Sequence, residues 1–348
     1  MLNRLSALAI VPKAKAIAAR RLTPADYDEL MRKGSVLEIV AALRAHPYFK
    51  DSLAGLSGAN IHREQLEQAL ARDIFYKYES LLHYVSSKGG GFASFFMMRC
   101  EIEELLEKLR LLAMGFRHHY IARLPGFLAD KTSFSLIRLA KAETPAECLD
   151  VVAGTPYARV LEPVIPKDGA KLDHLLCEHA LWSYYFETAL AQVRAGRNAA
   201  QTRRLFLMEA EIYDLDLIWR AKAFFPADFT PERLRALLVC RPAVLSAKAL
   251  RQMADAPDAK AFLQLYNASR AAQVYGARSG DPAADDNTAP QRAWCRTAER
   301  LLHFSSAPQT VLAALLCLAT IDRSNIINVV EGVRYSLPPA EIRAFLKL

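Results

Sequence analysis

The sequence predicts an all-α protein, and three observations support this fold class. Of the 348 residues, 52% are hydrophobic, which is enough to fill a substantial core and excludes a disordered chain. Glycine is scarce, at 14 residues, whereas an all-β sandwich needs a turn every few residues. Nearly every long segment repeats its apolar residues at helical spacing, so helices account for the chain best.

Three helix starts follow one pattern. Thr23-Pro24-Ala25-Asp26 combines an N-cap threonine, a proline at the first helical position and an acidic residue in the first turn. The same order of residue types recurs at Thr144-Pro145-Ala146-Glu147 and at Thr230-Pro231-Glu232. This recurrence indicates an internal repeat.

One helix in each repeat carries the clearest register. Glu101, Glu211 and Asp322 are separated by 110 and 111 residues. The residues four and eight positions after each acid are apolar, which predicts one buried stripe on an amphipathic helix, and the residue three positions after it is polar. The apolar residues are Leu105, Leu215, Ile326, Leu109, Trp219 and Val330, and the polar residues are Glu104, Asp214 and Asn325.

We therefore predict three similar helical bundles, over residues 1–125, 126–228 and 229–348. Proline-containing breaks at Leu124-Pro125-Gly126 and Phe225-Pro226-Ala227 mark the boundaries. Two short markers recur at compatible spacing, namely His46-Pro47-Tyr48 with Thr155-Pro156-Tyr157 and Leu81–Tyr84 with Leu301–Phe304. Lys88–Gly91 and Arg278–Gln291 are predicted to be flexible loops.

The formal net charge is +8, and it is unevenly spread. The first and third predicted bundles each carry five surplus positive charges, whereas the second has two surplus negative charges. Such a balance favours an anionic partner, which could be a nucleic acid, a membrane surface or an acidic protein. Because no single element interleaves basic and aromatic residues extensively, nucleic acid is not the expected partner.

The chain is not expected to cross a membrane. Its longest apolar stretch, Val311–Ile321, is too short to span a bilayer and is better interpreted as part of a buried core helix. The basic first 22 residues resemble a transit peptide superficially, but we expect them to belong to the fold. Six widely spaced cysteines without a C-x-x-C pair are typical of reduced core residues in a cytosolic protein.

No catalytic, cofactor-binding or metal-ligating residue is predicted. The glycine cluster at Lys88–Gly91 lacks the order of a phosphate-binding loop, and His174, Cys177 and His179 do not share one helix face. The acid-rich segment Glu101–Glu107, interleaved with Lys108, predicts a solvated helix face.

The two ends of the sequence resemble a known family. The closing segments Asp322–Gly332 and Tyr335–Ile342, the opening segment Ala14–Tyr27 and His46-Pro47-Tyr48 are similar to the C subunit of bacterial and archaeal V/A-type rotary ATPases, whose eukaryotic V-ATPase counterpart is the d subunit. The sequence departs from the family pattern at Glu331 and Val333.

The resemblance implies a funnel of three bundles about a pseudo-threefold axis and a non-catalytic role. Such a protein sits on the membrane rotor ring, peripheral to the membrane, holds the foot of the central shaft and passes torque between them. It would be present in one copy per complex and be monomeric in isolation. As candidate interface residues we take Arg110, Arg220 and Glu331, which share one repeat position, on a polar face that could point to the shaft.

Two other interpretations remain at this stage. A helical-repeat adaptor unrelated to rotary ATPases would stack its bundles linearly. A helical enzyme would hold a concave site with convergent ionisable groups.

Overall fold

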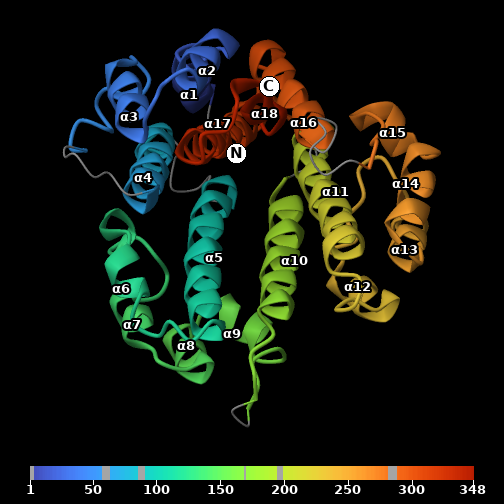
Figure 1. Cartoon of the computed structure of the whole chain (residues 1–348). Coiled ribbons are helices and arrows are strands. Elements are labelled where there is room, and N and C mark those ends of the chain that lie inside the picture. Colours follow the sequence, from blue (N-terminus) through green and yellow to red (C-terminus); the bar gives the residue numbers. More distant parts are fainter. Residues whose placement is uncertain (1–3, 57–62, 85–90, 168–169, 194–198, 281–287) are drawn as a thin grey trace. The chain divides into compact units, whose positions relative to one another are not determined.

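The computed structural model describes residues 4–56, 63–84, 91–167, 170–193, 199–280 and 288–348 (Figure 1). Every regular element in these ranges is a helix, so the predicted fold class is confirmed. The chain divides into two compact units.

The larger unit comprises Met1–Gly89, Arg194–Arg235 and Cys240–Leu348, so it joins both ends of the chain. Its helices are α1 (Arg4–Ala18), α2 (Pro24–Met31), α3 (Val36–Ala45), α4 (Arg63–Leu82), α11 (Ala199–Phe224), most of α12 (Pro231–Leu237), α13 (Ala247–Asp255), α14 (Ala259–Asn267), α15 (Arg270–Tyr275), α16 (Ala289–Phe304), α17 (Pro308–Arg334) and α18 (Pro339–Ala344).

The smaller unit comprises Gly90–Val193 and Ala236–Val239. It contains α5 (Gly91–Ala113), α6 (Tyr120–Arg123), the 3₁₀ turn η2 (Gly126–Leu128), α7 (Leu136–Lys141), α8 (Pro145–Val151), α9 (Pro156–Leu161) and α10 (His174–Gln192). In this unit α5 and α10 pack along each other. The three bundles with boundaries at residues 125 and 228, and their funnel arrangement, stay predictions.

The three predicted N-caps form. Helices α2, α8 and α12 begin at the prolines after Thr23, Thr144 and Thr230, and each threonine side chain accepts a backbone N–H from the first turn. At Thr23 the cap is reciprocal, because the Asp26 carboxylate also accepts the Thr23 N–H at 2.7 Å. Burial raises the pKa of Asp26, but the hydrogen bonds from Thr23, together with His46, outweigh it and hold the pKa below its ordinary 3.8.

We predict that Thr23→Ala lowers the free energy of unfolding by about 1 kcal/mol, because the Asp26 N–H at the start of α2 loses its acceptor. Thr23→Ser keeps the hydroxyl and should unfold like the parent. Since the folded-state pKa of Asp26 is depressed, its contribution is present above its ordinary pKa and disappears as the pH falls through the folded value. Urea unfolding of the three proteins at neutral pH and below about pH 4 measures both effects. An equal loss in the alanine and serine variants would contradict the cap.

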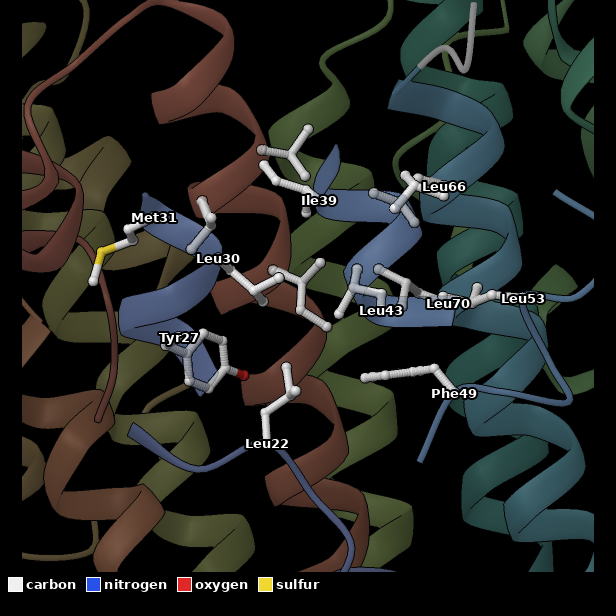
Figure 2. Packing of buried hydrophobic residues seen from close by; sticks show 14 of the residues in the cluster. Leu22, Tyr27, Leu30, Met31, Ile39, Leu43, Phe49, Leu53, Leu66 and Leu70 are labelled. Carbon is white, nitrogen blue, oxygen red and sulfur yellow. The ribbon is translucent and has the colours of Figure 1, made fainter. Parts of the chain in front are cut away.

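One core cluster of the larger unit is built from both ends of the chain. Leucine and aromatic side chains of α2, α3 and α4, including Tyr27, Leu43 and Leu70, pack in one cluster with Ile326 and Val330 of α17 (Figure 2). Helix α1 also packs on α17 and α4, with Ile10 and Ala14 fully buried. The basic N-terminal segment therefore contributes to the fold, as predicted.

Helix α17 occupies the middle of this unit. It is the one described helix long and apolar enough to cross a membrane by length and composition, yet 78% of its most apolar window is buried inside the protein. All residues from Val311 to Leu318 are buried. The interpretation of Val311–Ile321 as a core segment is confirmed.

Gly332 brings α18 against α17. A Cβ added to Gly332 would lie 2.5 Å from Cγ1 and 2.8 Å from Cδ1 of Ile342, whose side chain is fully buried. We predict that Gly332→Ala costs about 1–3 kcal/mol through overpacking. Shortening the neighbour in Gly332→Ala/Ile342→Val should recover part of that loss in thermal unfolding. Parental stability of the single variant would contradict the close approach.

Two local predictions were wrong. The segment from Glu101 to Lys108 is not a solvated face, because Glu101 and Lys108 are buried. The Lys108 ammonium instead donates to the carbonyls of Arg117 and Ala140, at 2.9 and 3.2 Å. Burial lowers the pKa of Lys108, and the two carbonyl oxygens offset part of the cost of burying its charge.

The predicted loop Arg278–Gln291 is not flexible at its ends. Arg278 is buried and pairs with Asp216 of α11 at 2.9 Å, while Gln291 lies inside α16 and also donates to Asp216. Residues 281–287, like Lys88–Gly90 of the other predicted loop, lie outside the described residues.

Candidate protein interface

Three long helices carry the repeat position, and in each the acid is buried. Glu101 lies on α5, Glu211 on α11 and Asp322 on α17. A buried carboxylate is costly unless hydrogen-bond donors surround it. All three accept a hydrogen bond from a tyrosine hydroxyl, but the remaining donors differ.

Glu211 is held by backbone N–H groups. Its carboxylate accepts from Ala243 and Val244 at 3.1 Å and from Leu245 at 2.8 Å, and the Tyr275 hydroxyl donates to its other oxygen. Burial and the nearby carboxylate raise the pKa of Tyr275, so the tyrosine stays a donor. The segment between α12 and α13 is thereby fixed to α11.

Glu101 plays the same part in the smaller unit. It accepts from the Ser133 backbone N–H and from the Tyr157 hydroxyl, which lies 2.5 Å from it. Burial, followed by the Glu101 charge, raises the pKa of Tyr157. Tyr157 belongs to the Thr155-Pro156-Tyr157 marker, so that repeat marker has a structural role.

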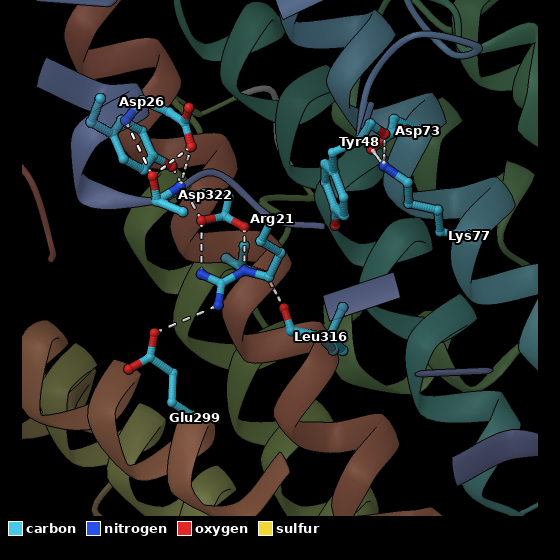
Figure 3. A network of polar contacts seen from close by, with 11 residues as sticks. Arg21, Asp26, Tyr48, Asp73, Lys77, Glu299, Leu316 and Asp322 are labelled. Atoms are coloured by element: carbon cyan, nitrogen blue, oxygen red, sulfur yellow. Dashed lines mark hydrogen bonds and ion pairs between the residues drawn. The ribbon is translucent and has the colours of Figure 1, made fainter. Parts of the chain in front are cut away.

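Asp322 is held by a charged partner from the N-terminal segment (Figure 3). The Arg21 guanidinium donates to both carboxylate oxygens, at 2.5 and 2.8 Å, and the Tyr27 hydroxyl donates at 3.1 Å. Glu299 of α16 lies 3.6 Å from the same guanidinium. Burial alone would lower the pKa of Arg21, but the charge and hydrogen bonds of Asp322 outweigh burial and raise this pKa above its ordinary value. The guanidinium therefore stays charged and the ion pair persists.

The predicted stripe behind each acid is confirmed. The six apolar residues four and eight positions after the acids are all buried. The polar residues three positions on are buried in two of the helices, at Asp214 and Asn325, and half-buried at Glu104. Each long helix is therefore fixed along its middle by a carboxylate and by apolar packing.

The predicted interface residues lie one turn from the ends of these helices. Arg110 on α5 is exposed and pairs with Glu107 at 2.6 Å, and Arg220 on α11 is exposed. Glu331 on α17 is half-buried and lies 3.4 Å from Arg63 of α4. Arg220 and Glu331 belong to the larger unit and Arg110 to the smaller one.

The sequence reasoning missed the residues four positions further along. Met114, Phe224 and Tyr335 follow the three acids by the same interval and are 57, 50 and 67% exposed. Each of the three helix ends thus exposes one large apolar side chain at the same repeat position. The 110- and 111-residue register already contained this signal, because it continues unbroken to the helix ends.

Comparison with known proteins shows the family. A family model described as ATP synthase (C/AC39) subunit matches residues 10–345, a range that contains all three acids. The chain belongs to this family. The resemblance seen in the two ends of the sequence is therefore confirmed, and the chain is a C/AC39-type subunit of the V/A-type ATP synthases.

Two relatives within the C/AC39 family match part of the chain. The C subunit of the A-type ATP synthase of Desulfurococcus sp. (strain SY) is 26% identical over 154 residues, which cover 44% of this chain and 40% of the relative. The C subunit of the A-type ATP synthase of Methanosphaera stadtmanae is 24% identical over 134 residues, covering 38% and 34%. The matched stretch thus spans less than half the length of each relative.

In this C/AC39 family member, the His and Cys residues weighed as a metal site are hydrogen-bonded to backbone carbonyls or buried. His174 contacts the Leu106 carbonyl at 3.1 Å, His179 contacts the Leu237 carbonyl at 2.9 Å, and Cys177 is buried between them in sequence. Burial raises the pKa of Cys177 to about 12. Across the described ranges no three His, Cys, Asp or Glu side chains are grouped as metal ligands.

Proposed function

We propose that the chain is the non-catalytic central-stalk subunit of a V/A-type ATPase. In this proposal it joins the rotor shaft to the membrane rotor ring and transmits the torque that couples ATP hydrolysis or synthesis to ion transport. It is peripheral to the membrane and present in one copy per complex. Family membership supports the assignment to the ATP synthase.

A torque-transmitting part must resist deformation, and the buried acids supply one reason why this chain would. Each long helix is tied to its neighbouring segments by charge-assisted hydrogen bonds, which are shorter and stronger than neutral ones. Dense apolar packing on the same helix adds stiffness, because protein interiors are close-packed. The function requires no covalent chemistry of this chain.

The exposed helix ends carry the proposal of partner contact. Arg220 and Phe224 lie one turn apart on α11, and Arg110 and Met114 stand at the same repeat positions at the end of α5. A large apolar side chain beside an arginine is a combination enriched at protein interfaces. Contacts of this kind exclude water around the apolar group while the charge sets orientation.

The deciding experiment is co-purification of the full chain with the shaft proteins and with the rotor ring. Binding of the parent to both is the expected result, and binding to neither would overturn the proposal. Arg110→Glu/Arg220→Glu should weaken shaft binding about tenfold or more, since charge reversal at an interface rim is unfavourable. Arg138→Glu/Arg251→Glu makes the same charge change at exposed positions of both units and serves as the control.

The adaptor interpretation makes a different prediction for the same experiment. A helical-repeat adaptor unrelated to rotary ATPases would bind neither shaft nor ring. Family membership favours the central-stalk role over this alternative. The three-bundle arrangement about a pseudo-threefold axis is part of the proposal, and electron microscopy of the assembled complex tests it.

A further inference from the structure

The N-terminal helix α1 joins two helix ends that the sequence marked as equivalent. Lys13 donates to the Ser80 carbonyl at 3.1 Å in the last turn of α4, and Lys15 donates to the His303 carbonyl at 2.8 Å in the last turn of α16. The two equivalent segments, Leu81–Tyr84 and Leu301–Phe304, lie at these helix ends. Helix α1 packs against α17 and α4 (Figure 1).

Each of these helix ends exposes an aromatic ring. Tyr84 is 43% exposed and lies under the Lys13 ammonium, 5.1 Å from ring centroid to nitrogen. Phe304 is 77% exposed, more than any other large apolar side chain in the described residues, and stands edge-on to His303. Neither ring is explained by the proposed contacts of α5, α11 and α17.

The surroundings of the two rings are basic. Residues 1–25 contain no acidic side chain. Arg300 is exposed and precedes Phe304 by four residues, so both lie on one face of α16. The neighbouring Glu299 is 54% exposed and lies 3.6 Å from Arg21, which already pairs with Asp322, so it leaves one negative charge beside these basic residues. An ammonium group has three donors, and the bonds to Ser80 and His303 take one from each lysine. We name Lys13, Lys15, Tyr84, Arg300, His303 and Phe304 the α1 patch.

We propose that the α1 patch binds the surface of an anionic phospholipid bilayer. Aromatic rings prefer the headgroup level of a membrane, and lysine and arginine beside them are attracted to anionic lipid. A bilayer accepts single rings from separate helix ends, whereas a protein partner must supply a fitted pocket for each. The proposal goes beyond the stalk function, because lipid binding requires neither the rotor shaft nor the membrane rotor ring.

Vesicle co-sedimentation of the full chain tests it. Binding to phosphatidylcholine vesicles that contain phosphatidylglycerol should exceed binding to pure phosphatidylcholine about tenfold or more, and added salt should reduce it. Lys13→Gln/Lys15→Gln and Phe304→Ser should each lower the partition coefficient about tenfold. Lys248→Gln/Lys260→Gln and Phe225→Ser change residues of the same types elsewhere in the larger unit and should bind like the parent. These residues are exposed, whereas Lys13 and Lys15 are half-buried, so the lysine control is the more accessible pair.

Two further variants separate lipid contact from damage to the fold. Lys13→Arg/Lys15→Arg keeps the charge and should retain binding. Phe304→Trp should show a blue-shifted emission with anionic vesicles and none with neutral ones. Equal binding to both vesicle types, or no binding, would overturn the proposal even if shaft and ring still bind. If the patch variants instead bind vesicles like the parent but no longer bind the membrane rotor ring, the patch contacts an acidic protein surface and the lipid proposal is wrong.

Discussion

Replacing Glu211 by leucine is expected to lower the free energy of unfolding of the larger unit by about 3 kcal/mol or more, since each donor left unsatisfied costs about 1–3 kcal/mol. The carboxylate is fully buried, and it is the acceptor for the Tyr275 hydroxyl and for three successive backbone N–H groups at residues 243–245. Leucine has a similar size but accepts no hydrogen bond, so the buried Tyr275 hydroxyl and three part-buried backbone N–H groups lose their acceptor. Chemical unfolding followed by tryptophan fluorescence measures the loss, in a Trp182→Phe background so that the signal comes from Trp219 and Trp294 of this unit.

Two variants calibrate the effect of Glu211→Leu. Tyr275→Phe removes one of the four donors and should cost about 2 kcal/mol, as for a hydrogen bond to a charged group. Arg220→Ala changes an exposed residue of the same helix and should stay within about 0.5 kcal/mol of the parent. If Glu211→Leu unfolded like Arg220→Ala, the carboxylate would not anchor the segment between α12 and α13.

Breaking the pair between Arg21 and Asp322 should have an effect of similar size. Arg21→Met leaves the buried Asp322 carboxylate with only the Tyr27 hydroxyl, and the expected loss is about 3–5 kcal/mol. This pair joins the segment before α2 to α17, 301 residues later. Its loss should therefore destabilise the packing of the N-terminal helices on α17 in addition to lowering the stability of the whole unit. Hydrogen exchange should accelerate in α2 and α3 before the rest of the unit.

The double variant Arg21→Met/Asp322→Leu tests the pair as a pair. Removing both charges leaves no unpaired buried charge, although the Tyr27 hydroxyl loses Asp322 as its acceptor, so part of the stability lost in Arg21→Met should return. If the loss in the double variant equalled the sum of the losses in Arg21→Met and Asp322→Leu, the two side chains would act independently. Met and Leu keep the volume of the site close to that of the parent, which limits the cavity contribution.

The local part of the fold follows from the sequence because its causes are local. Helix starts at Thr23, Thr144 and Thr230 depend on residues within one turn, and all three formed. The stripe behind Glu101 and Glu211 depends only on helical period, and it is buried as predicted. For the same reason the register extends to the exposed residues at the helix ends.

The partners of the buried acids could not be predicted, because their separations differ. Tyr157 follows Glu101 by 56 residues and Tyr275 follows Glu211 by 64, whereas Tyr27 precedes Asp322 by 295. No common spacing therefore marks the tyrosines. Lys108 was misjudged for a related reason, since its acceptors are carbonyls of segments that arrive only in the folded chain.

The core shared by the two ends of the chain constrains how the protein is made on the ribosome. The apolar faces of α2, α3 and α4 are synthesised early, but the side chains that cover them, from Ile326 to Leu346, follow more than 250 residues later. At about 5–20 residues per second this delay is roughly 13–50 s. During that time the N-terminal helices must remain partly uncovered, so we expect the nascent chain to depend on chaperones until α17 emerges.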